Sequence, residues 1–141
     1  MDNRFPLCVV DTVKASDVDV GVSFTPIAGK IDQAAGLMFR VKDANNYYVA
    51  RANALENNVN LYHVVKGVRR QIARVNVSVV TGKTQQLGAR IEGDTIKVSL
   101  DGRQLIAVND RTIQGSGAVG LWTKADSVTA FYELTISVLR E

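Results

Sequence analysis

The sequence is poor in the residues that build disulfides, zinc sites and catalytic dyads. Its 141 residues include one cysteine, one histidine, one tryptophan and two prolines. One cysteine cannot form an internal disulfide, and one cysteine with one histidine cannot supply the three or four ligands of a structural zinc site. Cys8 as a nucleophile would need His63 as its base, and the spacing does not pair them. We expect Cys8, in its apolar segment, to be a small buried residue.

Several functional patterns are also absent. No apolar run approaches 18 residues, which excludes a membrane-spanning helix. The first residues, Met1-Asp2-Asn3-Arg4, have no apolar stretch behind them and are not a signal peptide. No Gly-x-Gly-x-x-Gly follows a strand into a helix, so a phosphate-binding loop is not expected.

Charge of either sign is limited. Lys plus Arg is 17 and Asp plus Glu is 14, a net charge of +3. The densest basic cluster, Lys66, Arg69, Arg70 and Arg74, surrounds one expected hairpin turn and has no aromatic stacking platform, so we expect a solvated hairpin and no nucleic-acid partner. Asp and Asn are plentiful, so a calcium site with oxygen ligands stays open; no other cofactor is expected.

Alternation of apolar and polar residues is the dominant signal in the chain. Every second residue is apolar from 18 to 24, from 96 to 100 and from 128 to 138. This period of two is typical of a strand with one face on a core. We expect eight further strands at Phe5–Val10, Ala34–Val41, Tyr47–Asn53, Val59–Lys66, Val68–Val79, Gln86–Glu92, Gln104–Val108 and Ala118–Thr123.

Short polar turns separate these segments. Asp101-Gly102 is a two-residue hairpin signal, and Lys66-Gly67, Thr81-Gly82 and Gly93-Asp94 indicate turns of the same kind. No window combines a helical period with a cap; 50–58 is interpreted as the end of a strand and a loop. About eleven short strands predict an all-β sandwich or barrel, formed as a single domain by residues 1–141.

Five segments, in order, resemble one known fold family. They are Gly36-Leu37-Met38-Phe39-Arg40, the run from Asp43 through Tyr47-Tyr48 to Asn53, Asn60-Leu61-Tyr62 through Gly67, Ile96 through Asp101-Gly102, and Gly120-Leu121-Trp122-Thr123-Lys124-Ala125-Asp126-Ser127. Together they resemble concanavalin A-like jelly rolls of the laminin-G type, near the bacterial 3-keto-disaccharide hydrolase and laminarinase-like domains. The resemblance covers Val18 to Val138 and implies an all-β jelly-roll sandwich of two antiparallel sheets.

The resemblance also implies a function class. It implies a bacterial, secreted or periplasmic module that binds an oligosaccharide or polysaccharide on the concave face of a sheet without catalysis. Two alternatives stay open: a glycoside or 3-keto-sugar hydrolase, and a protein-binding or adhesion module. Domains of this type carry a strand and a signal peptide ahead of the segment matching Asp2-Asn3-Arg4-Phe5, which leaves open a missing N-terminal strand. A monomer and a homodimer, in which edge strands pair, are both open.

Aromatic faces and planar polar side chains are the groups that hold sugars. On this basis the expected ligand-binding residues are Arg40, Tyr47, Arg51, Asn53, Trp122 and Lys124. Period two places Tyr47, Arg51 and Asn53 on one face and Tyr48 on the other. The competing interpretations are that Trp122 fills the core, and that the two arginines pair with Asp43 or Glu56.

Carboxylates for hydrolysis are not found in the expected pattern. Laminarinase-type relatives carry Glu-x-Asp-x-(x)-Glu on one strand, which places the carboxylates on one face. Here Asp17-Val18-Asp19 and Glu92-Gly93-Asp94 lack the further carboxylate. Convergence from different strands stays open for Asp43, Glu56, Asp126 and Glu133, whereas His63 is expected to be an exposed surface residue.

Overall fold

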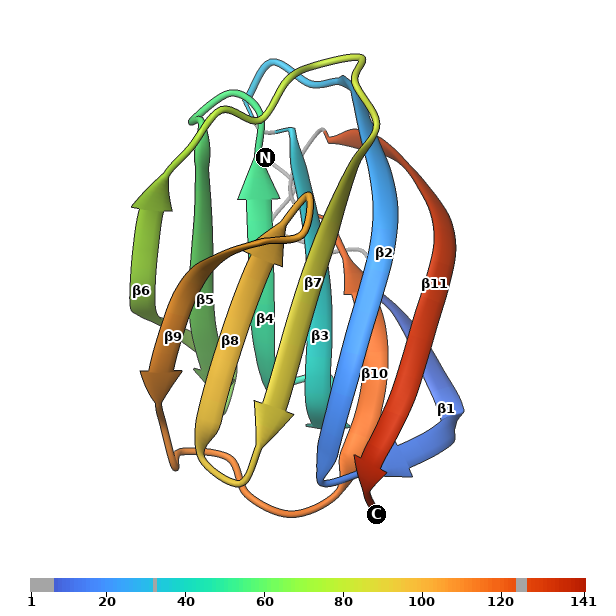
Figure 1. Ribbon diagram of the computed structural model, residues 1–141, viewed down its shortest axis with the longest axis vertical. Coiled ribbons are helices and arrows are strands. Elements are labelled where there is room, and N and C mark those ends of the chain that lie inside the picture. The colour runs from blue at the N-terminus through green and yellow to red at the C-terminus, as the bar shows by residue number, and fades with distance from the viewer. Residues whose placement is uncertain (1–6, 32, 124–126) are drawn as a thin grey trace.

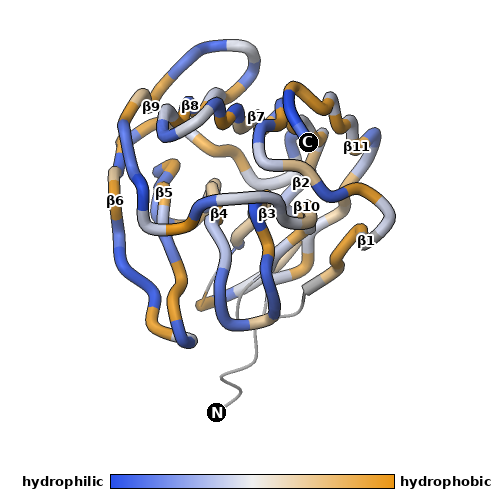
Figure 2. The backbone as a smooth tube through the Cα atoms, turned by 90° about the horizontal axis from the view of Figure 1, so that it is seen from below, coloured by the Kyte–Doolittle hydropathy of each residue, from blue (hydrophilic) through white to orange (hydrophobic). Residues whose placement is uncertain are grey.

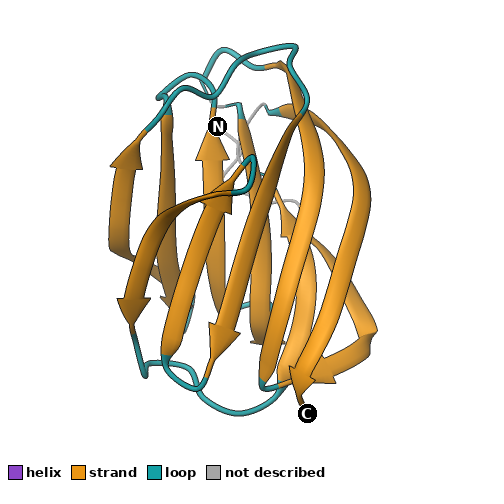
Figure 3. Ribbon diagram, in the orientation of Figure 1, coloured by secondary structure: helices purple, strands orange, loops and turns teal. Residues whose placement is uncertain are grey.

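The computed structural model describes residues 7–31, 33–123 and 127–141. The regular secondary structure in these ranges consists of β-strands. Figure 3 shows these strands with loops gathered at the two ends of the molecule. No helix in these ranges is long and apolar enough to cross a membrane. The strands are β1 (Leu7–Ala15), β2 (Asp17–Ala28), β3 (Ala34–Asp43), β4 (Asn46–Asn53), β5 (Asn58–Val65), β6 (Val68–Asn76), β7 (Gln85–Glu92), β8 (Thr95–Leu100), β9 (Arg103–Asn109), β10 (Gly117–Trp122) and β11 (Val128–Arg140).

The strands form two antiparallel sheets that face each other (Figure 1). A six-stranded sheet has the order β1-β10-β3-β4-β5-β6, and a five-stranded sheet has the order β11-β2-β7-β8-β9. Seen from one end, the sheets are separate layers, with β6 beside β9 on one side and β1 beside β11 on the other (Figure 2). The expectation of a sandwich of two antiparallel sheets is confirmed.

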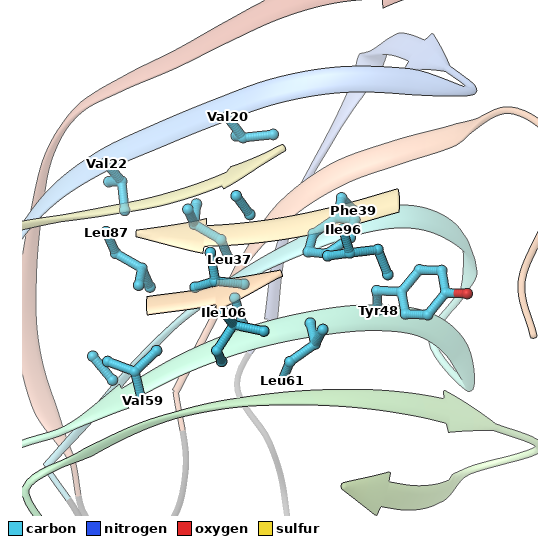
Figure 4. Close-up of a cluster of buried hydrophobic side chains, with 14 of the residues drawn as sticks. Val20, Val22, Leu37, Phe39, Tyr48, Val59, Leu61, Leu87, Ile96 and Ile106 are labelled. Carbon is cyan, nitrogen blue, oxygen red and sulfur yellow. The ribbon is translucent and has the colours of Figure 1, made fainter. Parts of the chain in front are cut away.

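The core lies between the sheets and follows the alternation seen in the sequence. Figure 4 shows Val20, Val22 and Leu87 of the five-stranded sheet facing Leu37, Phe39 and other side chains of the six-stranded sheet. Along β2 every second residue from Val18 to Phe24 is at most 3% exposed. Alternating strands bury one face each because their side chains point to opposite sides of the sheet.

Strand β4 is buried on both faces. Tyr48, Ala50 and Ala52 point into the core, whereas Tyr47 and Val49 point away from the five-stranded sheet. We call this second side the outer face of the six-stranded sheet. It carries a separate group of buried side chains, the outer apolar cluster: Ala34, Met38, Val41, Tyr47, Val49, Tyr62, Val64, Ala118 and Trp122.

Turn chemistry predicted three hairpins correctly, including Gly93-Asp94, which joins the antiparallel strands β7 and β8. Asp101 and Gly102 have φ of 52° and 79°, and Lys66 and Gly67 have φ of 52° and 77°. Positive φ at both central residues is the mirror-image turn that matches the twist of paired strands. Thr81-Gly82 differs, because its turn lies in the crossover from β6 to β7, which belong to different sheets.

Three sequence expectations are corrected by the structure. Cys8 is exposed, because it lies on β1, an edge strand. Strand β6 ends at Asn76 instead of Val79, because the chain leaves the sheet there. Val79 is apolar because it is buried against the core.

Strand β11 also differs from its expected alternation. A bulge with Glu133 at φ 51° reverses the alternation, so Phe131 packs on the core and Tyr132 is 49% exposed.

Candidate functional site

A row of side-chain positions crosses the outer face of the six-stranded sheet. Trp122 lies opposite Gly36, Gly36 opposite Arg51, Arg51 opposite Asn60, and Asn60 opposite Arg74. Directly opposed residues in antiparallel strands have Cβ atoms about 5 Å apart and share a face. The five positions, one each on β10, β3, β4, β5 and β6, therefore form one continuous row.

The indole of Trp122 occupies the space left by a missing side chain. A Cβ atom on Gly36 would lie 3.1 Å from Cβ and Cε3 of Trp122 and 3.0 Å from Cγ2 of Val49. Glycine at position 36 thus lets the ring lie over β3 and beside β4. Burial raises the pKa of the Tyr47 hydroxyl in the same cluster, and a hydrogen bond with the Trp122 side chain partly opposes this effect.

An ion pair stands next to the aromatic end of this row. Arg51 Nη2 donates to Glu56 Oε2 at 2.9 Å, and the Arg51 side chain is only 4% exposed whereas that of Glu56 is 48% exposed. Asn58 Nδ2 lies 3.5 Å from the same carboxylate oxygen. A buried guanidinium and a buried amide are therefore held around one carboxylate that remains open to solvent.

The turn from β4 to β5 holds Glu56 in place. The side-chain oxygen of Asn53 accepts hydrogen bonds from the backbone N–H groups of Leu55 and Glu56, at 2.9 and 3.2 Å. Asn57 has φ 51°, and its side-chain oxygen accepts from the backbone N–H of Val79 at 3.1 Å. Asparagine is suited to both tasks because its short side chain bonds to nearby backbone and tolerates positive φ.

Tyr62 organises the next part of the face. The guanidinium carbons of Arg51 and Arg69 lie 5.2 and 4.7 Å from the centroid of its ring. With its amide oxygen turned toward them, Asn60 accepts hydrogen bonds from the Tyr62 hydroxyl at 2.7 Å and from Arg51 Nη2 at 3.3 Å. Arg51, Asn60 and Tyr62 therefore fix one another's positions.

Two buried polar atoms of the site have no hydrogen-bond partner among the described residues. They are Nε of Arg51, a donor, and Oδ1 of Asn58, an acceptor. A buried polar atom without a partner costs about 1–3 kcal/mol, and most buried polar atoms are paired. A hydroxyl both accepts and donates hydrogen bonds, so hydroxyl groups suit each of these two atoms.

Four of the six expected ligand-binding residues come together on this face. Tyr47, Arg51, Asn53 and Trp122 all lie on the outer face, and all are buried. Of the two competing interpretations, the pairing of Arg51 with Glu56 is found. Trp122 is buried, but in the outer apolar cluster instead of the core between the sheets. Lys124 lies outside the described residues.

Arg40 does not join the others. It has φ 47° at a bulge between β3 and β4, and this bulge breaks the alternation that would place it beside Met38 on the outer face. Its guanidinium instead closes one end of the sandwich. It donates to the carbonyls of Ser16, Ile113 and Gly93 at 2.7, 3.0 and 2.6 Å, and to Asp17 Oδ1 at 3.2 Å.

Sequence reasoning missed part of the site. Asn58, Asn60 and Tyr62 are not among the ligand-binding residues that the sequence predicts. A signal existed, because Asn58, Asn60 and Tyr62 alternate directly after the Arg51 strand and so share one face of the next strand. The three asparagines at 57, 58 and 60 obscured it, because asparagine is also the typical residue of turns.

The carboxylates considered for hydrolysis lie at separate places in the described part of the fold. Asp43 and Glu56 lie beyond opposite ends of β4, and Glu133 lies on β11 of the other sheet. Asp43 caps its turn, where hydrogen bonds from Asn45 and Asn46 hold the pKa of its carboxyl below the ordinary value. Asp126 lies outside the described residues.

His63 is more buried than expected. His63 lies on β5, and its side chain is 16% exposed. Its Nδ1 lies 3.8 Å from Oδ2 of Asp110. No group of three or more His, Cys, Asp or Glu side chains within the described ranges is arranged to hold a metal ion. The calcium site with oxygen ligands that the sequence leaves open stays a hypothesis.

Comparison with known proteins places this geometry among carbohydrate-related folds. No family model matches the chain. A levanase of Bacillus subtilis (strain 168) is 28% identical over 129 residues, which are 90% of this chain and 19% of the levanase. The structure of a carbohydrate-binding module, CBM66 from Bacillus subtilis, matches with a TM-score of 0.86 and 27% identity over 96% of this chain and 83% of that chain.

A more distant likeness concerns the fold alone. A β-glucanase of Bacillus licheniformis has a TM-score of 0.67 at 14% identity, covering 91% of this chain and 69% of that chain. The chain has the concanavalin A-like jelly-roll fold. The fold implied by the sequence motifs is thereby confirmed.

Proposed function

We propose that this chain is a carbohydrate-binding module whose saccharide lies on the outer face of the six-stranded sheet, at Arg51, Glu56, Asn58 and Trp122. The observation that carries the proposal is the buried donor and acceptor, Arg51 Nε and Asn58 Oδ1, left without hydrogen-bond partners in the described residues beside a solvent-open carboxylate. Sugar hydroxyls can supply both kinds of partner, an acceptor and a donor, and the neighbouring aromatic residues suit the apolar side of a sugar ring.

The likeness to a carbohydrate-binding module and to part of a levanase supports this choice of ligand class. Because the chain spans 19% of the levanase, the activity of that whole protein is not transferred to it. Levan is the first polysaccharide to test, since the name of that relative points to it. A module of this kind meets its polysaccharide outside the cytoplasm, so export is part of the proposal; recovery of the native protein in the cytosolic fraction of its cells would contradict that part.

A matched pair of variants tests the site. Arg51→Lys keeps the positive charge but removes Nε and the planar fork, so we expect affinity for the bound polysaccharide to fall at least about tenfold, the loss of one hydrogen bond to a charged group. Arg90→Lys is the control, because Arg90 pairs with Asp19 at 3.0 Å on the other sheet. The measurement is isothermal titration with levan and a panel of other polysaccharides.

The proposal fails if no polysaccharide in the panel binds. The assignment of the site fails if Arg51→Lys binds as tightly as the unchanged protein, or if Arg90→Lys loses as much affinity. Near-ultraviolet circular dichroism of both variants checks that the aromatic packing is retained.

A further inference from the structure

Strand β6 extends the outer face to the edge of the six-stranded sheet with arginine side chains. Arg74 lies opposite Asn60 and Arg69 lies opposite Val64, both of which point to the outer face. Gln71 lies between them, opposite Tyr62. Arg69, Gln71 and Arg74 are all exposed, so a ligand held at Arg51 reaches them by extending across two strands.

Positive charge on this part of the face has little to balance it. Arg51, Arg69 and Arg74 are the basic residues here, and Glu56, the one acidic residue from Asn46 to Asn76, is already engaged by Arg51. Neither Arg69 nor Arg74 forms an ion pair with any residue in the described ranges. Two guanidinium groups that share one tyrosine ring repel each other, and an anion placed beside them relieves that repulsion.

The side-chain type narrows the class of anion. An edge strand protected only against aggregation typically uses lysine, which is flexible and strongly hydrated. Arginine presents a planar fork of donors that matches a carboxylate or sulfate with two parallel hydrogen bonds. Tyr62 helps to order that fork in Arg69 by holding its guanidinium over the ring, which lowers the entropy lost on binding.

We propose that the saccharide bound by this module is an acidic polysaccharide, with a carboxylate or sulfate group set against Arg69 and Arg74 while hydroxyls of a neighbouring sugar meet Arg51 and Asn58. This inference rests on the proposed function. It replaces the sequence-based interpretation of the β5–β6 hairpin as merely solvated, because that interpretation does not account for arginines gathered on the face of the binding row.

The test compares polysaccharides that differ only in charge. Polygalacturonate and its methyl-esterified form share a backbone, as do dextran sulfate and dextran, and levan is the neutral probe of the proposed function itself. Affinity electrophoresis at 150 mM salt, about physiological ionic strength, screens weak nonspecific attraction. We expect one acidic polysaccharide to bind at least about tenfold more tightly than its neutral partner.

Two double variants separate a built site from general attraction. Arg69→Gln/Arg74→Gln removes two charges from the outer face, and we expect it to lose at least about tenfold in affinity. Arg70→Gln/Lys97→Gln removes the same charge elsewhere, because Arg70 opposes the inward-facing His63 and Lys97 lies on the other sheet. We expect this control to lose less than about twofold.

Each outcome decides the inference. Preference for polygalacturonate or for dextran sulfate identifies the carboxylate or the sulfate form of the ligand. Equal binding of charged and neutral partners, equal losses in the two double variants, or equally tight binding of single-stranded DNA overturns the acidic class. If levan binds and both double variants retain it, the proposed function stands without this inference; if nothing binds, both fail.

Discussion

Two buried arginines stand in opposite situations. All three guanidinium nitrogens of Arg40 donate, to three backbone carbonyls and one carboxylate. Arg51 has one strong partner, Glu56, and its Nε has none among the described residues. Breaking a buried charge network whose donors are all used is strongly destabilising, whereas a buried donor without a partner can accept a ligand as its partner.

Removing Arg40 should therefore destabilise the protein and leave its binding site intact. We expect Arg40→Ala to lower the free energy of unfolding by about 3 kcal/mol, because three carbonyls lose a donor and Asp17 loses its ion-pair partner. Urea denaturation measures this value. The exposed Arg103→Ala is the control, with an expected change within about 0.5 kcal/mol. Equal stability of the two variants would contradict the role given to Arg40.

At the residue scale, the sequence predicted as much of the site as strict alternation allows. Tyr47, Arg51 and Asn53 share a face because β4 is regular over its length. Arg40 departs because a non-glycine residue adopts positive φ at a bulge, and nothing in its local sequence marks that conformation. The roles of Glu56 and Asn58 depend on how a turn folds back on the sheet, which alternation does not describe.

Among the elements, strands and two-residue turns were predictable, and bulges and crossovers were not. Asp101-Gly102 fixes its hairpin because both residues tolerate positive φ. The bulge at Glu133 shifts the register of β11 against β2, and so exchanges the faces of Phe131 and Tyr132. It arises where β11 pairs with β2, which is distant in sequence. Which strands become neighbours, such as β10 beside β1 and β3, depends on contacts distant in sequence.

The loop from β9 to β10 is tied to the core by one carboxylate. The Tyr48 hydroxyl donates to Asp110 Oδ1 at 2.6 Å and accepts from the backbone N–H of Ile113 at 3.1 Å. The backbone N–H of Thr112 donates to the same carboxylate oxygen at 2.9 Å. Burial by itself would raise the pKa of Asp110, but these hydrogen bonds outweigh it and hold the pKa below the ordinary value.

This arrangement predicts a pH dependence of stability. Because the pKa of Asp110 is lower in the folded state, its contribution is full above the ordinary aspartate pKa of 3.8 and is lost as the pH falls through the folded value. We expect Asp110→Asn to be less stable than the unchanged protein at pH 7, with the difference narrowing below pH 3.8. Urea denaturation from pH 7 to pH 2.5 measures both. A difference that stays constant over this range would contradict the role of the carboxylate.

At the scale of the whole molecule, the two outer faces differ in chemistry. The six-stranded sheet carries aromatic and amide side chains with the two unpartnered polar atoms described above. The five-stranded sheet carries exposed ion pairs, among them Arg90 with Asp19 and Glu92, and a hollow of about 240 Å³ lined by Gly21, Gly88 and Ser99 among others. None of the described residues that line this hollow is aromatic. The six-stranded sheet is therefore the face suited to a sugar.

The most direct test is to locate the bound saccharide by nuclear magnetic resonance. Uniformly ¹⁵N-labelled protein is titrated with oligosaccharide fragments of whichever polysaccharide binds in the assays above. We predict saturable shifts at the side chains of Arg51 and Asn58 and at the indole of Trp122, with few changes on the other sheet. Shifts gathered instead at Gly21, Gly88 and Ser99 would place the ligand on the five-stranded sheet and contradict the account.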